Sequence, residues 1–302
     1  MAAKMIEAFL NYLTFEKRFS NKSVESYKID LLQFFYFIKN EFENDDLLIV
    51  KHNQVRAFVV HLVNANNKPS SIKRKISAIK SFYKYCQKTG KIENNPADKI
   101  NTPKSPERLP KFIEQQKINH LLEKPDLFFS KENDFDNMQE KLLIDVLYST
   151  GMRRQELINL QWSAIDFSNK QIKITGKGNK QRLMPVAHQL LDDLLQFKQF
   201  QREALKNIPI APYVFLTKDG KQLYPNYVYR IVKMHISHCS TVDKKSPHVL
   251  RHSFATHMSN NGAKLNDIKE LLGHASLAST QVYTHNTIEQ LKEIYKNSHP
   301  KA

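Results

Sequence analysis

A histidine and an arginine stand three positions apart, at His248 and Arg251, in the segment SPHVLRHSFATHM. Ser246 and Pro247 suit the N-cap and the first position of a helix, so both side chains are predicted to project from one face near the helix N-terminus. The positive end of the helix dipole favours an anion at that place. Because an H-x-x-R pair is common on protein surfaces, the pair by itself indicates only a candidate anion site.

Other cationic side chains and a tyrosine occur in the second half of the chain. The segments are STGMRRQEL with Arg153, GKG with Lys177, the histidine–arginine segment above, and LLGHASLASTQVYTH with His274 and Tyr283. When a phosphodiester is broken without a metal, cationic donors must neutralise charge on the nonbridging oxygens, and arginine does so with a permanently charged, bidentate group. A histidine can donate to the same phosphate or exchange a proton with the nucleophile. These residue types are the ones that a phosphoryl-transfer step without a metal would need.

These segments, in this order, resemble the tyrosine recombinase (phage integrase) family, and the chain is most similar to the bacterial Xer-type site-specific recombinases within it. The resemblance covers essentially the whole chain, strongly for residues 140–302 and more loosely for residues 5–100. It implies an enzyme that breaks and rejoins DNA without a metal or ATP, through a 3′-phosphotyrosyl bond and a free 5′-hydroxyl group. Because the energy of the broken bond is retained for rejoining, no cofactor is expected.

The resemblance assigns roles to individual residues. Tyr283 is the expected nucleophile, and its phenol, with an ordinary pKa near ~10, needs a base and a field of positive charge to attack at neutral pH. Lys177 is the expected general acid for the departing 5′-hydroxyl group. Glu156 matches the family's acidic position and would orient a catalytic side chain, with an exposed helical glutamate as the alternative. The residues expected to contact the phosphate are Arg153, His248, Arg251 and His274.

Helices are predicted around the arginine segments. Residues 140–160 have a helical pattern that Gly151 interrupts, and Glu156 opens the next turn. The helix that begins at Pro247 has Gly262 as its expected C-terminal cap.

A change of period predicts strands between these helices. In residues 171–186, Ile172 and Ile174 alternate with polar residues, the turn GKGNK follows, and Leu183 lies on the return. This pattern predicts a β-hairpin with Lys177 at its tip.

The pattern of apolar residues in the first hundred residues predicts helices. Ser20 can cap a helix whose apolar residues recur over 24–38. Ser70 or Ser71 can cap a second helix, whose apolar residues recur over 72–83.

The second of these helices also carries basic residues beside its apolar face. In a chain this basic we expect them to contact DNA phosphates, with an ordinary solvated face as the alternative. They are Lys73, Lys80 and Lys84 in one stripe, with Arg74 and Lys75 nearby.

A length of 302 residues suits two domains. Residues 94–110 contain four prolines and no apolar periodicity, which is typical of an exposed connection. We therefore expect a DNA-binding domain at 1–98, a linker at 99–110 and a catalytic domain at 111–302. The fold class is mainly α: the resemblance implies a two-domain DNA clamp, with a helical SAM-like core-binding domain and a mostly helical catalytic domain that has a small antiparallel β-sheet.

The resemblance further implies that a C-terminal helix, roughly over residues 287–297, docks in trans on a neighbouring protomer. The apolar side chains of Ile288, Leu291 and Ile294 or Tyr295 need a surface to cover them. Packing against the helix's own domain is the alternative.

Composition favours nucleic acid as the partner. Lysine and arginine number 46 against 30 acidic residues, a net charge of +16, and the excess falls on both residues 1–100 and residues 101–302. This distribution suits a polyanion held between two folded units. The sequence has two unrelated cysteines, and it has no nucleotide-triphosphate loop, zinc-ligand motif, secretion signal or uninterrupted apolar span. We expect no metal and no membrane contact, and a location in the cytoplasm, associated with the nucleoid.

The expected partner is duplex DNA with a specific recombination site. The subfamily implies a homo- or hetero-tetramer with a paralogous recombinase, and a septal DNA translocase as a further partner. The expected task is the resolution of chromosome or plasmid dimers at cell division. The alternatives are an integrase of a mobile element, a type IB topoisomerase-like enzyme and a non-catalytic DNA-binding protein.

Overall fold

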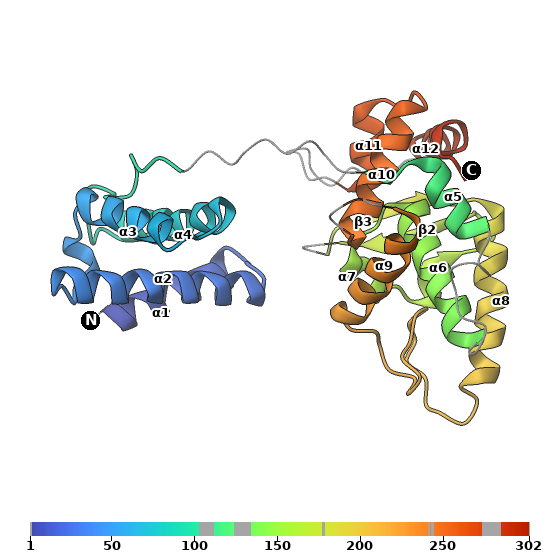
Figure 1. Cartoon of the computed structure of the whole chain (residues 1–302), viewed down its shortest axis with the longest axis horizontal. Coiled ribbons are helices and arrows are strands. Elements are labelled where there is room, and N and C mark those ends of the chain that lie inside the picture. The colour runs from blue at the N-terminus through green and yellow to red at the C-terminus, as the bar shows by residue number, and fades with distance from the viewer. Residues whose placement is uncertain are drawn as a thin grey trace. The chain divides into compact units, whose positions relative to one another are not determined.

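The computed structural model describes residues 2–102, 112–123, 134–176, 179–240, 242, 245–273 and 285–301. The chain forms two compact units, Met1–Arg108 (unit 1) and Leu109–Ala302 (unit 2), and each is described by itself. Both are mainly helical, and the predicted fold class is confirmed (Figure 1). Within the described residues, the structure contains no helix with the length and apolarity that a membrane crossing requires.

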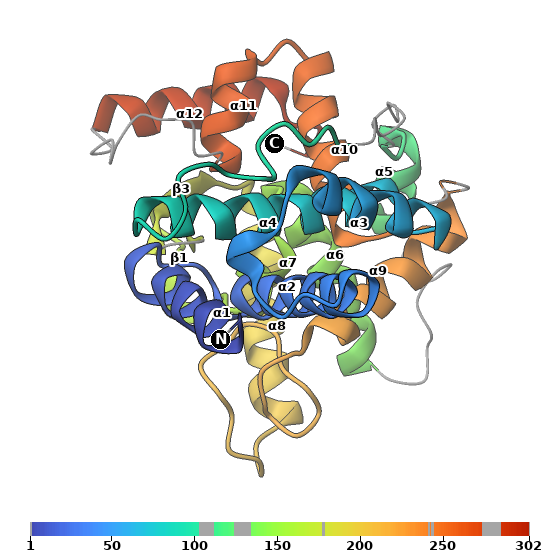
Figure 2. The ribbon, with the colours of Figure 1, turned by 90° about the vertical axis from the view of Figure 1, so that its left-hand side faces the viewer.

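Unit 1 consists of helices around one apolar core (Figure 2). α4 packs along α2, and aromatic side chains such as Phe34, Phe58 and Phe82 are fully buried between the helices. The elements are α1 (Ala2–Asn11), a π-helical turn η1 (Tyr12–Glu16), α2 (Asn21–Phe42), a 3-10 turn η2 (Leu47–Ile49), α3 (His52–Asn64) and α4 (Pro69–Lys88).

The predicted N-cap of α2 is confirmed, and that of α4 is corrected. The Ser20 hydroxyl oxygen accepts a hydrogen bond from the Ser23 backbone N–H at 3.4 Å. α4 begins at Pro69, one residue before the predicted cap positions, and Lys68 is the N-cap. Proline suits the first helical position because its missing N–H would have no partner there.

Unit 2 is a helical domain (Figure 1). It has one small antiparallel sheet, with the strand order β1-β2-β3. Its long helix α6 packs against both α8 and α10 and is the centre of the core. The helices are α5 (Gln115–Glu123), α6 (Asp134–Thr150), α7 (Arg154–Ile158), η4 (Trp162–Ala164), α8 (His188–Ala204), α9 (Pro225–Cys239), α10 (Pro247–Asn260), α11 (Leu265–Leu272) and α12 (His285–Ser298). The strands are β1 (Ile165–Asp166), β2 (Gln171–Thr175) and β3 (Gln181–Pro185).

The predicted β-hairpin is present. Ile172 pairs with Met184, and Ile174 pairs with Arg182. Because paired residues share one face of the sheet, Arg182 and Met184 point into the core, and Leu183 between them is only half-buried.

The C-terminal helix α12 packs on its own unit within this chain, and its docking on a neighbouring protomer stays a prediction. Leu291 and Tyr295 are buried in the core of unit 2, and the Tyr295 hydroxyl donates to the backbone oxygen of Ser149 at 3.0 Å. The apolar face of the helix is therefore covered by α10, α11 and the end of α6 within one chain.

Gly151 provides a test of how tightly the end of α6 is packed. Its φ is +56°, and a Cβ atom there would lie 2.7 Å from Leu272 Cδ2 and 2.8 Å from Phe254 Cδ1. We expect Gly151→Ala to lower the free energy of unfolding of unit 2 by about 2–4 kcal/mol, since the positive φ and the overpacked core both oppose the methyl group. Urea unfolding followed by the fluorescence of Trp162, the single tryptophan, measures it.

The matched control is Gly262→Ala. Gly262 also has a positive φ, of +93°, and nothing lies within 4 Å of its Cβ position. This variant is expected to lose only the backbone contribution, so equal losses in the two variants would contradict the packing argument.

Candidate active site

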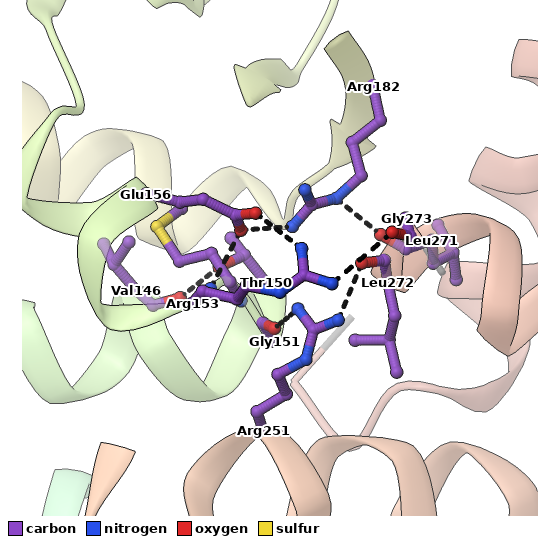
Figure 3. Close-up of polar contacts among 11 residues, drawn as sticks. Val146, Thr150, Gly151, Arg153, Glu156, Arg182, Arg251, Leu271, Leu272 and Gly273 are labelled. Atoms are coloured by element: carbon purple, nitrogen blue, oxygen red, sulfur yellow. Dashed lines mark hydrogen bonds and ion pairs between the residues drawn. The ribbon is translucent and has the colours of Figure 1, made fainter. Parts of the chain in front are cut away.

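Three arginines from three separate elements surround Glu156 (Figure 3). Arg153 precedes α7, Arg182 lies on β3 and Arg251 lies on α10. Glu156 Oε1 accepts a hydrogen bond from Arg153 Nη1 at 2.7 Å, and Glu156 Oε2 accepts from Arg182 Nη2 at 2.8 Å. The carboxylate therefore holds two of the guanidinium groups, and its own side chain is only 4% exposed.

The local chain path explains how Arg153 reaches this position. α6 ends at Thr150, and the positive φ of Gly151 turns the chain away from the helix axis. Arg153 is extended and serves as the N-cap of α7, where its backbone N–H donates to Glu156 Oε2 at 2.9 Å. A glutamate at the third helical position that bonds back to the N-cap N–H is half of a capping box. The carboxylate is therefore buried, in contrast to the exposed alternative, and its role in orienting a catalytic side chain stays a prediction.

Arg251 is buried beside them and holds two loops together. Its Nη1 donates to the backbone oxygen of Gly151 at 2.6 Å, and its Nη2 donates to that of Leu272 at 2.7 Å. The two arginine-bearing segments, separated by about a hundred residues in sequence, are thus joined at the end of α6.

The site has an excess of positive charge. Burial, then the charges of Arg153 and Arg182, lower the pKa of Arg251 to about 10, so its guanidinium is still charged at neutral pH. Burial alone would raise the pKa of Glu156, but the hydrogen bond and charge of Arg182, and then the hydrogen bonds from Arg153, lower it. Three cations thus surround one ionised carboxylate, and such an arrangement binds an anion.

His248 lies in the first turn of α10 beside these charges. Loss of hydration, then the positive charges of Arg154, Arg251 and Arg153, lower its pKa below the ordinary value. The imidazole is therefore mainly neutral at pH 7, and in that form it can accept a proton.

Among the residues predicted to be catalytic, the structure brings Arg153, His248 and Arg251 together. Lys177, His274 and Tyr283 lie outside the described residues. The residues directly before two of them contact the cluster. A Cβ atom on Gly176 would lie 3.2 Å from Glu156 Oε1, and the backbone oxygen of Gly273 lies 3.5 Å from Arg153 Nη2.

Arg182 is the functional-site residue that sequence reasoning missed. Its signal is the alternation of β3, in which Arg182 occupies a position on the same face as the buried Met184. A charged residue on the apolar face of a strand requires a buried partner, and here that partner is Glu156.

The basic residues of α4 fall into two groups. The side chains of Lys73 and Lys84 are exposed, and Lys80 Nζ donates to the backbone oxygen of Asp98 at 2.9 Å. Arg74 and Lys75 form ion pairs with Asp30, whose side chain is fully buried.

This corrects the prediction for Lys75. Its ammonium group lies in the core, 3.1 Å from Asp30 Oδ1, where an adjacent helix binds it instead of a phosphate. We leave Lys75 out of the DNA-contacting set.

The described residues contain no group of three or more histidine, cysteine, aspartate or glutamate side chains that could hold a metal ion.

Comparison with known proteins gives matches over both units. Residues 111–290 match the phage integrase family, and residues 6–90 match the phage integrase N-terminal SAM-like domain. The chain is 36% identical to the tyrosine recombinase XerC of Chlorobaculum parvum, over 99% of this chain and 95% of that protein. It is 32% identical to the tyrosine recombinase XerD of Pasteurella multocida, over 99% of this chain and 98% of that protein.

A solved structure with a similar fold is that of the XerH site-specific recombinase bound to palindromic difH substrate in a post-cleavage complex. It is 26% identical, with a TM-score of 0.71, and the match covers 89% of this chain and 78% of the other.

The charge environment of His248 leads to a prediction for Arg154. We expect Arg154→Gln to raise the pKa of His248 toward its ordinary value, because the substitution removes a positive charge that disfavours the imidazolium ion. Histidine NMR titration, with the signal assigned by its loss in His248→Gln, measures the shift. The control is Arg202→Gln, an exposed arginine on α8, which should leave the pKa unchanged; a downward shift in Arg154→Gln would contradict the assignment.

Proposed function

The chain belongs to the phage integrase family, the tyrosine recombinases, and from this membership we propose that it recombines duplex DNA at a specific site through a phosphotyrosyl intermediate on Tyr283. It is a DNA cleaving and rejoining enzyme. The observation that carries the proposal is the cluster of three guanidinium groups around Glu156, which has more positive charge than its own carboxylate neutralises.

The proposed reaction exchanges one phosphodiester bond for another. The phenolate oxygen of Tyr283 attacks the scissile phosphorus, the bond from phosphorus to the 5′-oxygen breaks, and Lys177 gives that oxygen its proton. Arg153 and Arg251 donate to the nonbridging oxygens, where negative charge increases in the transition state. Attack by the free 5′-hydroxyl group of another strand reverses the step, so the number of phosphodiester bonds is conserved and no ATP is consumed.

The histidines handle protons and the remaining phosphate contacts. We assign His248 as the group that accepts the tyrosine proton, since its lowered pKa favours the neutral imidazole. His274 follows the end of α11, whose carbonyl groups contact the arginines, and we assign it as a further donor to the same phosphate.

The biological task that we propose is the resolution of chromosome or plasmid dimers at cell division. Similarity to XerC and XerD proteins over nearly the full chain supports it. On this proposal the protein acts in the cytoplasm, on the nucleoid, within a tetramer that pairs two DNA sites. A paralogous recombinase and a septal DNA translocase are the proposed partners. An integrase of a mobile element would have the same catalytic residues, so the sequence of the target site distinguishes the two roles.

The nucleophile is tested with nicked suicide duplexes that carry candidate sites from the terminus region of the host chromosome. The wild-type protein should give a covalent protein–DNA band on a denaturing gel, and Tyr283→Phe should bind the duplex without forming that band, because phenylalanine lacks the attacking oxygen. Tyr224→Phe, in which an exposed tyrosine of the same unit is changed, is the matched control and should form the band. A band with Tyr283→Phe would show that another residue is the nucleophile.

The exposed lysines of α4 are tested by salt dependence. Each phosphate contact adds roughly 0.9 to the slope of log affinity against log salt, so the double variant Lys73→Gln/Lys84→Gln should lower the slope by about two units. Fluorescence anisotropy with a labelled duplex at several salt concentrations measures it. Lys39→Gln, which removes a lysine that pairs with Asp45, should change the slope less. An unchanged slope in the double variant would mean that this face is an ordinary solvated surface.

A further inference from the structure

Arg182 is the most buried of the three arginines, and the reaction above gives it no part. Its side chain is 5% exposed, whereas that of Arg153 is 36% exposed. Its Nη2 donates to Glu156 Oε2 and its Nε donates to the backbone oxygen of Leu271, both at 2.8 Å. Because these two donors are engaged within the protein, Arg182 acts on its surroundings through the groups it holds.

The last turn of α11 is bound by all three arginines, each at a different carbonyl group (Figure 3). Arg182 Nε binds the oxygen of Leu271 at 2.8 Å, Arg251 Nη2 binds that of Leu272 at 2.7 Å, and Arg153 Nη2 lies 3.5 Å from that of Gly273. The final carbonyl groups of a helix lack intrahelical partners and form the negative end of its dipole. The end of α11 thus supplies negative charge that Glu156 alone does not.

Arg182 also fixes the point at which the chain leaves α11. Gly273 has a φ of +64°, and a Cβ atom there would lie 3.1 Å from Arg182 Cδ and 3.3 Å from Arg182 Nη1. The arginine therefore packs directly against the bare backbone of Gly273. The next residue in the chain is His274.

The guanidinium group of Arg182 is also connected to Arg153, because both arginines bind Glu156. Glu156 Oε2 is shared between Arg182 Nη2 and the backbone N–H of Arg153, and Glu156 Oε1 binds Arg153 Nη1. Without Arg182, the carboxylate would lose its most buried partner and would be free to move with Arg153. Arg182 therefore joins β3, α7 and α11 at one point.

We propose that Arg182 is a positioning residue for DNA cleavage: it holds Glu156 and the end of α11 so that Arg153 and His274 approach the same phosphate. This inference rests on the function proposed above. The two hydrogen bonds run to groups on different elements, and a planar guanidinium can make both at once. A lysine at this position would retain the positive charge beside Glu156, but it could not make both hydrogen bonds in the same geometry.

The test compares Arg182→Gln and Arg182→Lys with the wild-type protein on the nicked suicide duplex. At saturating protein, we expect Arg182→Gln to slow the first-order appearance of the covalent band by roughly 10²-fold, the size expected when a reacting group is misplaced by about 1 Å. DNA affinity should stay within about twofold, because Arg182 is enclosed and the phosphate contacts that give affinity are made elsewhere. Arg182→Lys should recover part of the rate.

A matched control separates positioning from loss of stability. Met184→Ala changes a buried side chain on the same strand and the same face, and leaves the arginine contacts in place. It should lower the unfolding midpoint, measured by Trp162 fluorescence, with little change in the cleavage rate of the bound complex. Equal rate losses in Arg182→Gln and Met184→Ala would overturn the proposal, as would a wild-type rate in Arg182→Gln.

A measurement without DNA keeps the inference separate from the proposed function. Amide hydrogen exchange at residues 271–273 should be faster in Arg182→Gln than in the wild-type protein, and unchanged in Met184→Ala. If the wild-type protein bound every duplex and cleaved none, the proposed function would fail. In that case faster exchange would still support the hold of Arg182 on α11, and unchanged exchange would overturn it.

Discussion

The concentration of positive charge around Glu156 is the constraint on which the rest of unit 2 depends. Burying like charges together opposes folding, and the fall in the pKa of Arg251 to about 10 reflects loss of hydration first and then repulsion by Arg153 and Arg182. The fold offsets it with one carboxylate and with the carbonyl groups at the ends of α6 and α11. Such a cluster of enclosed guanidinium groups attracts an anion.

That arrangement requires chain segments far apart in sequence to pack closely against one another in fixed positions. Gly151 allows the end of α6 to approach α10 and α11, and Arg251 then bonds to its carbonyl oxygen. The C-terminal helix supports the same place, since Tyr295 bonds to Ser149 in the last turn of α6. A displacement of α12 would therefore shift the end of α6 and the turn that carries Arg153. Within the described residues, the helix itself makes no hydrogen bond to the arginines.

Local features of this structure could be predicted from the sequence, and long-range partnerships could not. The cap of α2 at Ser20, the N-terminus of α10 at Pro247 and the β-hairpin each depend on a few neighbouring residues whose preferences agree. The burial of Lys75 depends on Asp30 from another helix. The inward position of Arg182 depends on hairpin register, in which a shift of one residue exchanges the two faces. The alternation of β3 places Arg182 on the face of Met184, but the spacing of residues within either segment does not identify Glu156 or Asp30 as the partner.

The two kinds of basic side chain in this protein differ in their exposure to solvent. Lys73 and Lys84 are exposed, so salt would screen the attraction to phosphate that we propose for them. Arg251 and Arg182 are enclosed, where screening is weak and each charge acts at nearly full strength on its neighbours. The exposed lysines belong to unit 1 and the enclosed arginines to unit 2, and each unit has its own apolar core, so a substitution in one set leaves the core of the other unit unchanged.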